Sequence, residues 1–118
     1  MSQHIPNVNR ADVERVATRD FPADKVSQIF TLLSRYGIES YHQEIDRVHL
    51  DILKLADGDL DRVSQEVENA CCDFRDTILA AEYPNYGKKM FQIDKFPPEE
   101  RRSISNKDKE QYELWLRR

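Results

Sequence analysis

Apolar residues recur every three or four positions through most of this chain, which is the spacing of one face of an α-helix. The spacing predicts a first helix over residues 9–19, with Asn9 as its N-cap, and a second over residues 23–36. The second helix has the clearer stripe, which consists of Val26, Ile29, Phe30, Leu33 and Tyr36. Gly37 follows as a residue that can adopt the positive φ at which many helices end.

Two longer helices are predicted next, over residues 40–57 and 59–83. The first of these begins at Ser40, where "SYHQ" has the form of a capping box. Its apolar stripe is Tyr41, Ile45, Val48, Ile52, Leu55 and Ala56. The other helix carries a nearly heptad stripe and is expected to stop before Pro84. That stripe is Leu60, Val63, Val67, Ala70, Phe74, Ile78 and Ala81.

Residues 84–105 show no such period, yet they are rich in large apolar side chains. We expect this stretch to be an irregular segment that packs across the helices, followed by a helix within residues 106–118. Connections between the predicted helices are short, which favours antiparallel neighbours. The predicted fold is therefore an all-α antiparallel bundle of four helices, with an aromatic-rich strap and a short C-terminal helix, in a single domain.

Composition agrees with this fold class. The chain has 118 residues, enough for one domain, and only 3 glycines, too few for the tight turns of a β-sandwich or barrel. It has no run of 18 apolar residues and no secretory signal at its start, so we expect a cytoplasmic protein. Cys71 and Cys72 are adjacent, and neighbouring cysteines rarely bridge, so we expect two reduced thiols.

Charge is unevenly distributed along the chain, whose net charge is −4. Residues 1–84 hold 9 Lys or Arg and 16 Asp or Glu, a net of −7, whereas residues 85–118 hold 9 and 6, a net of +3. Opposite signs favour the basic segment lying back on the acidic body. Nucleic-acid binding through this segment, with Arg101 and Arg102 as phosphate contacts, is an alternative hypothesis.

The stretch from residue 42 to residue 63 holds the candidate metal ligands. On a continuous helix, His42, Asp46 and His49 would share one flank, and imidazole and carboxylate groups are common ligands of divalent metals. The alternative is a histidine at the border of the core that bonds to a neighbouring carboxylate. The acidic residues around Gly58 have part of the spacing of a calcium loop, but Arg62 stands where such a loop needs glycine. A turn with Gly58 after one helix and Asp59 capping the next explains the same residues more simply.

No nucleotide-binding, hydrolase or metalloprotease fingerprint occurs, so we predict neither catalytic residues nor a cofactor. The favoured hypothesis is a non-enzymatic protein–protein interaction module, with self-association as one form of it. Aromatic residues dominate the energetics of interfaces, so the candidate binding residues are aromatic. They are Tyr83, Tyr86, Phe91, Phe96, Tyr112 and Trp115. A metal-binding protein or metal-dependent enzyme built on the two histidines and Asp46 remains the second hypothesis.

A resemblance covers roughly residues 39–86. "RVHLDILKLADGDL", followed by "DFRD" and "AEYP", resembles a pattern in a family of small uncharacterised bacterial helical proteins. The resemblance implies a bacterial, cytosolic, helical protein. It implies no activity and no functional residue.

Overall fold

The computed structural model describes residues 5–118, and every regular element among them is helical. The predicted all-α fold class is therefore confirmed. The α-helices are α1 (Arg10–Asp20), α2 (Val26–Leu33), α3 (Ile45–Ala56), α4 (Leu60–Cys72), α5 (Phe74–Glu82), α6 (Pro84–Lys89) and α7 (Pro98–Arg117). Two 3-10 turns, η1 (Ala23–Lys25) and η2 (Met90–Lys95), precede α2 and follow α6. None of the helices within residues 5–118 is both long enough and apolar enough to cross a membrane.

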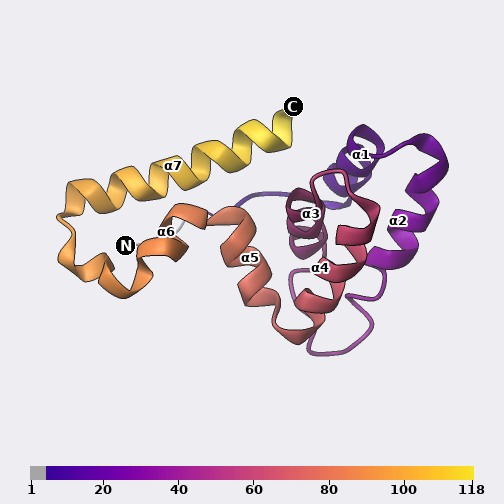
Figure 1. Cartoon of the computed structure of the whole chain (residues 1–118), viewed down its shortest axis with the longest axis horizontal. Coiled ribbons are helices and arrows are strands. Elements are labelled where there is room, and N and C mark those ends of the chain that lie inside the picture. The colour runs from indigo at the N-terminus through magenta and orange to yellow at the C-terminus, as the bar shows by residue number, and fades with distance from the viewer. Residues whose placement is uncertain (1–4) are drawn as a thin grey trace.

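Helix α3 lies at the centre of the molecule and packs against α1, α4 and α5 (Figure 1). Its sequence around "VHLDILKLA" is apolar on most sides, so a large part of its surface is buried. Helix α5 leads away to α6 and η2, and α7 then runs back along α6 and α5 (Figure 1). The predicted turn between α3 and α4 is confirmed. Gly58 follows α3 with φ +80°, and Asp59 caps α4, because its carboxylate accepts the N–H of Asp61 at 2.9 Å.

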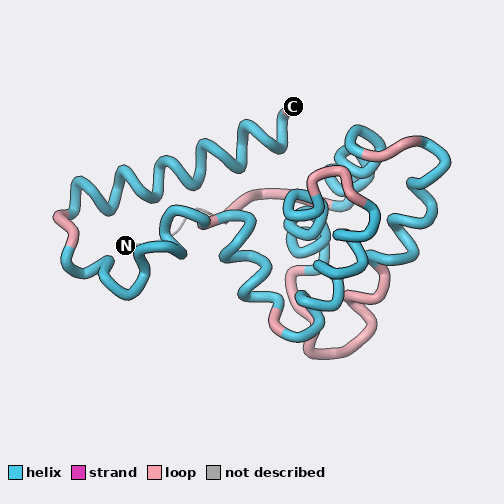
Figure 2. Tube along the Cα trace, in the orientation of Figure 1, coloured by secondary structure: helices cyan, strands magenta, loops and turns pink. Residues whose placement is uncertain are grey.

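The predicted helix over residues 40–57 begins too early. Helix α3 starts only at Ile45, and a loop separates it from α2 (Figure 2). Ser40 therefore caps no helix. Two side chains form hydrogen bonds with the backbone of this loop instead. They are Tyr36, which lies just after α2, and His42, which lies in the loop itself. These contacts bring together residues five to seven positions apart, which a helical period does not predict.

The predicted helix over residues 59–83 is two helices. The break is at Asp73, whose backbone is extended (φ −157°, ψ 99°) and whose carboxylate accepts the N–H of Arg75 at 3.0 Å. Asp73 thus ends α4 and caps α5. Pro84 does not end helical structure either, because it occupies the first turn of α6, where a missing N–H costs nothing.

The predicted irregular segment over residues 84–105 is also wrong, because α6, η2 and the first two turns of α7 occupy most of it. Helix α7 starts at Pro98, and Glu99 and Glu100 lie favourably in its first turn. Its buried face includes Ile104 and Asp108, four residues apart. Because Asp108 is acidic, the buried face of α7 does not show a regular apolar period in the sequence, and the start of the helix was not predicted.

Helix α7 is attached to α5 and α6 by polar side chains. The carboxylate of Asp108 accepts the backbone N–H groups of Asn85 (2.8 Å) and Tyr86 (3.0 Å) and the Asn85 side-chain amide (2.9 Å). It therefore satisfies free donors at the start of α6, whose own N-cap residue provides no such bond. Gln111 donates from Nε2 to the carbonyl oxygens of Ala81 (3.1 Å) and Glu82 (3.3 Å) at the end of α5.

The other end of α7 lies against α1. Arg15 donates to the Leu116 carbonyl at 2.8 Å, and Arg19 donates to the Trp115 carbonyl at 2.8 Å. These guanidinium groups are positive charges at the negative end of the α7 dipole, which stabilises the helix terminus. Arg19 also lies 5.3 Å from the centre of the Trp115 ring, within the range of a cation–π contact.

Replacing Asp108 by alanine should destabilise the protein by about 3 kcal/mol, because buried N–H groups would lose a charged acceptor. Urea unfolding measures this change. Glu110→Ala, at an exposed position on the same helix, is the matched control and should change the stability by less than about 1 kcal/mol. Equal effects of the two substitutions would contradict the capping role of Asp108.

Candidate functional site

The three candidate metal ligands do not share one helix flank. His42 lies in the loop before α3, where its Nδ1 accepts the backbone N–H groups of Gly37 (2.8 Å) and Glu39 (3.3 Å). Its ring stacks on the ring of Tyr36, with centroids 4.4 Å apart. Nδ1 is thus occupied by backbone N–H groups and Nε2 is buried, so His42 holds the loop and offers no accessible nitrogen to a metal.

Asp46 and His49 do lie on α3, but Arg10 from α1 stands beside both. Arg10 Nη2 is 2.6 Å from the Asp46 carboxylate and 3.1 Å from His49 Nδ1, and His49 Nε2 donates to the Tyr36 carbonyl at 2.8 Å. Burial lowers the pKa of His49, which keeps the ring neutral. In the part of the chain that the structure describes, no three His, Cys, Asp or Glu side chains gather in a way that could hold a metal ion.

The predicted aromatic binding residues divide by exposure. Tyr83, Tyr112 and Trp115 are buried in the protein's own interior, and Tyr86 and Phe96 are half-buried. Phe91 on η2 is 94% exposed. Of this set, only Phe91 offers most of its side chain to a partner.

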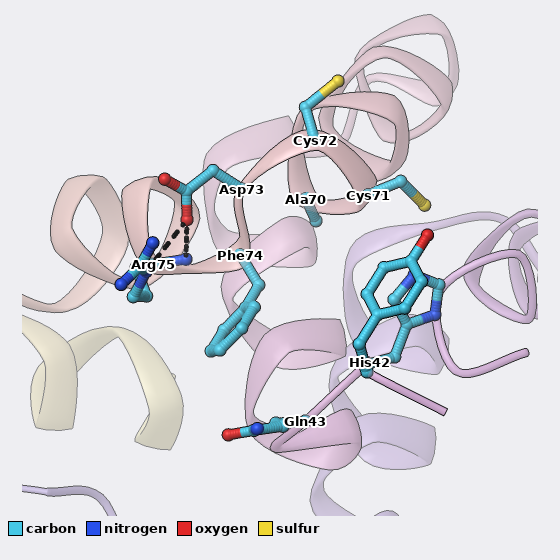
Figure 3. A pocket seen from close by; sticks show the side chains of 9 residues that line it. His42, Gln43, Ala70, Cys71, Cys72, Asp73, Phe74 and Arg75 are labelled. Carbon is cyan, nitrogen blue, oxygen red and sulfur yellow. Dashed lines mark hydrogen bonds and ion pairs between the residues drawn. The ribbon is translucent and has the colours of Figure 1, made fainter. Parts of the chain in front are cut away.

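A pocket of about 430 Å³ opens between the loop before α3 and the junction of α4 and α5 (Figure 3). Tyr41 and His42 line one side, and Cys71, Cys72 and Arg75 line the other. The two thiols point in different directions, because neighbouring residues of a helix are about 100° apart (Figure 3). They are free cysteines, as expected, and do not form a common pair of ligands.

The chemistry of this pocket does not favour nucleophilic catalysis. Burial, together with the nearby Cys72 and Glu68, raises the pKa of Cys71, so its thiol is neutral at pH 7. The thiol lies 3.7 Å from the Arg35 carbonyl, to which it donates a weak hydrogen bond. A base would have to remove its proton, but His42 has already used Nδ1 for the loop backbone.

The loop that borders the pocket is held in one conformation. The Tyr36 hydroxyl donates to the Gln43 carbonyl at 2.6 Å and accepts the Gln43 N–H at 3.1 Å. Gly37 has φ +126°, and Glu44, a non-glycine residue, has φ +55°. A positive φ at a residue such as Glu44 costs free energy and persists only where surrounding contacts impose it.

This fixed loop carries apolar side chains on its outer surface. Ile38 is 73% exposed, Tyr41 is 64% exposed and Ile45, at the start of α3, is 38% exposed. We call these three residues the loop face. The sequence stripe assigned Tyr41 and Ile45 to the core, which is wrong because Tyr41 is not helical. Ile38 was not predicted at all, since a single apolar residue in a loop carries no periodic signal.

No family model, curated protein or solved structure matches the chain. Function must therefore be inferred from the geometry of this molecule. A cluster of charged and hydroxyl groups also lies in the interior of the protein.

That cluster is centred on Arg47 of α3. Its guanidinium makes a two-pronged ion pair with Glu82 of α5, with Nη2 2.6 Å from Oε1 and Nε 2.8 Å from Oε2. It also donates to the Tyr83 hydroxyl at 3.1 Å. The Glu82 side chain has almost no contact with solvent. Burial, followed by the neighbouring Glu82 carboxylate, raises the pKa of Tyr83 to about 12.

Asp51 lies one turn after Arg47 and is completely buried. Burial raises the pKa of Asp51 well above its usual range, and the neighbouring Glu82 carboxylate acts in the same direction. Neither carboxyl oxygen of Asp51 makes a hydrogen bond of ordinary geometry within residues 5–118. The same holds for the buried hydroxyl of Tyr112 on α7. The cluster thus contains two carboxyl groups and one guanidinium, and a protonated Asp51 restores its charge balance.

The buried cluster joins helices and does not present a reactive group to solvent. Asp51 and Glu82 are both buried, so neither carboxyl group is accessible to a substrate in solvent. Its members come from α3, α5 and α7, so its effect is to specify how these helices meet. The sequence did contain a hint, since Asp51 stands between Leu50 and Ile52 in the most apolar part of α3.

Asp51→Asn should be more stable than the wild-type protein, and the difference in the free energy of unfolding should grow as the pH rises. The folded state binds the Asp51 proton more tightly than the unfolded chain, whose aspartates titrate near pH 4. The wild-type protein therefore loses stability as the pH rises from that value toward the raised pKa of Asp51, by up to about 1.4 kcal/mol per pH unit. Thermal unfolding at pH 5 and pH 8 measures the difference. The exposed variant Asp94→Asn is the control, and a pH-independent effect of Asp51→Asn would contradict a protonated Asp51.

Arg47→Ala should destabilise the protein by about 3–5 kcal/mol, because Glu82 would remain as a buried charge without its partner. Guanidinium-induced unfolding measures the change. Arg62→Ala, which removes an exposed arginine with a longer Glu66 contact of 3.4 Å, should cost less than about 1 kcal/mol. A small effect of Arg47→Ala would show that Glu82 takes up a proton or reaches solvent.

Proposed function

We propose that the protein is a non-enzymatic interaction module whose loop face binds another protein. The observation that carries this proposal is the exposure of Ile38 and Tyr41, on a loop held by partly buried polar contacts, and of Ile45 at the start of α3. Exposed apolar side chains that occur singly need no explanation, but three within one short, fixed segment beside a pocket indicate a binding surface.

Rigidity of the loop favours binding. A partner that docks on a flexible loop must offset the entropy of ordering it, whereas the Tyr36 and His42 contacts have already ordered this one. Tyr41 packs the edge of its ring against His42, with centroids 4.9 Å apart, and keeps most of its surface exposed. An aromatic side chain positioned in this way is the kind of anchor that dominates interface energetics.

The adjacent pocket extends the same surface. The pocket exposes more polar than apolar surface, with Asp73 and Arg75 in its lining. A polar side chain of the partner would therefore enter it while neighbouring apolar side chains cover Ile38 and Tyr41. The neutral thiol of Cys71 and the occupied Nδ1 of His42 support binding over catalysis as the role of this region.

The proposal places this module in the bacterial cytoplasm. Its support is the resemblance of residues 39–86 to small bacterial helical proteins, together with the two free thiols, a state that a reducing compartment maintains. Self-association of two copies through the loop face is a form of the same function.

The double variant Ile38→Ser, Tyr41→Ser tests the loop face. Both positions are exposed, so stability should change by less than about 1 kcal/mol, whereas partner binding should fall at least about tenfold. Affinity purification with quantitative mass spectrometry compares the proteins retained by the wild type, the double variant and the control Phe91→Ser. Sedimentation of the purified proteins detects a second copy as the partner.

Phe91→Ser removes a more exposed aromatic residue from a different part of the molecule, so it controls for general loss of apolar surface. The proposal requires a partner, or a dimer, that disappears in the double variant and persists in the control. If Phe91→Ser abolishes binding and the double variant does not, the interaction surface lies on η2 and the loop face is not the site.

A further inference from the structure

A second surface, away from the loop face, lies where the C-terminal end of α7 comes back toward the helices around α3 (Figure 1). A groove of about 790 Å³ is formed there by the last turn of α3, the first turn of α4 and the last turns of α7. Its volume is within the range of sites that hold ligands, roughly 300–1,000 Å³. None of its lining residues belongs to the loop face or to the pocket beside it.

The floor of the groove is apolar. Leu55 of α3 is half-buried, and Trp115 of α7 lies beneath the surface with 8% of its area exposed. Leu114, the residue before it, is 70% exposed at the edge. Leu114 is thus a large aliphatic side chain that points away from the core and has an apolar floor beside it.

The rim of the groove is positively charged. It carries Lys54, Arg62 and Arg118, against the single carboxylate of Asp57. This local excess of positive charge occurs in a chain whose net charge is −4. Arg62 also contacts Glu66 at 3.4 Å, so the remaining positive charge is modest, and it favours an occupant that carries negative charge.

Lys54 lies at the edge of this groove without an ion-pair or direct hydrogen-bonding partner in the described part of the chain, although it is half-buried. Burial lowers the pKa of Lys54, and the charge of Arg118 acts in the same direction, whereas the nearby carboxyl groups of Asp51, Asp57 and Asp108 raise it. Arg62 has only the 3.4 Å contact with Glu66, and half of its side chain is exposed.

We propose that this groove binds an acidic peptide segment of a partner protein, one that carries a large aliphatic side chain among its carboxylates. The aliphatic group covers Leu55 and Leu114 on the floor, and the flanking carboxylates pair with Lys54, Arg62 and Arg118. The groove is thus a second docking site, distinct from the loop face.

A peptide fits these groups better than a nucleic acid does. Single-stranded nucleic acids are held by stacking of their bases on exposed aromatic rings, with cations along the backbone. Trp115 is the aromatic ring of this groove, and it is too deeply buried to stack with a base. The exposed surface is instead aliphatic, which suits a leucine-like side chain.

The position of Trp115 supplies the measurement, since it is the sole tryptophan of the chain. The probe is an acetylated and amidated peptide of sequence Glu-Glu-Leu-Glu-Glu, titrated against the full chain while tryptophan fluorescence is recorded. We expect a saturable spectral change whose midpoint moves to higher peptide concentration as salt is added. The same peptide with serine in place of leucine should bind at least about tenfold more weakly, because burying a leucine is worth about 1.5–3 kcal/mol.

Charge reversal locates the site. Lys54→Glu and Arg118→Glu should each weaken binding about tenfold, and Leu114→Ser should weaken it similarly. Lys109→Glu makes the same change of net charge at an exposed position of α7 outside the groove and should leave the affinity unchanged. Using both Lys54→Glu and Arg118→Glu keeps the test decisive if one of them disturbs folding. The Ile38→Ser, Tyr41→Ser protein should bind the peptide normally, which separates this inference from the proposed loop function.

Four results of the peptide titrations would overturn the inference. They are an absence of saturable binding, equal binding of the leucine and serine peptides, an equal effect of Lys109→Glu, and displacement of the peptide by oligouridylate at lower concentration. The last would identify the groove as a nucleic-acid site. A dimer that dissociates on Leu114→Ser would assign this face to a second copy of the chain and would also exclude the peptide.

Discussion

The ion pair between Arg47 and Glu82 is the interaction on which the arrangement of the helices depends. Removing a guanidinium and a carboxylate from water costs several kcal/mol per group, and only close, two-pronged geometry offsets this cost. The two residues come from α3 and α5, and their 2.6 and 2.8 Å contacts leave little freedom in how these helices meet. Asp51 can join them in the interior only as a neutral acid, because one arginine cannot balance two carboxylates.

Helix α7 closes this interior with polar contacts as well as apolar ones. Tyr112 covers Asp51, Gln111 binds the end of α5 and Asp108 binds the start of α6. Gln111 and Asp108 would be costly to bury without these partners, so the two contacts favour one position of the helix along the body. The groove exists because that position leaves Leu114 and the rim cations beside the end of α3. The loop face has an equivalent origin, since Tyr36 and His42 hold the loop that exposes Ile38 and Tyr41.

The sequence predicted the helical class, the α3–α4 turn and most of the helical positions between residues 10 and 82. It did so where a local rule applies: an apolar period, a glycine at positive φ, or an aspartate that caps a helix. The predictions are wrong where hydrogen bonds of a polar side chain determine the conformation. Asp73 breaks the helix although the apolar period continues past it. His42 accepts backbone N–H groups in a segment whose sequence resembles a helix start. Asp108 conceals α7 because a buried carboxylate looks, in the sequence, like a solvent-facing residue.

Local residue patterns therefore set the short-range conformations, because φ/ψ preferences and caps depend on residues a few positions apart. The tertiary structure alone decided which charged side chains are buried and which apolar ones are exposed. Arg47 and Glu82 are 35 residues apart, and Asp108 and Asn85 are 23 apart, so no local pattern relates them. The free energy of a buried charge depends on the partner that packing brings to it, and that partner comes from a different helix.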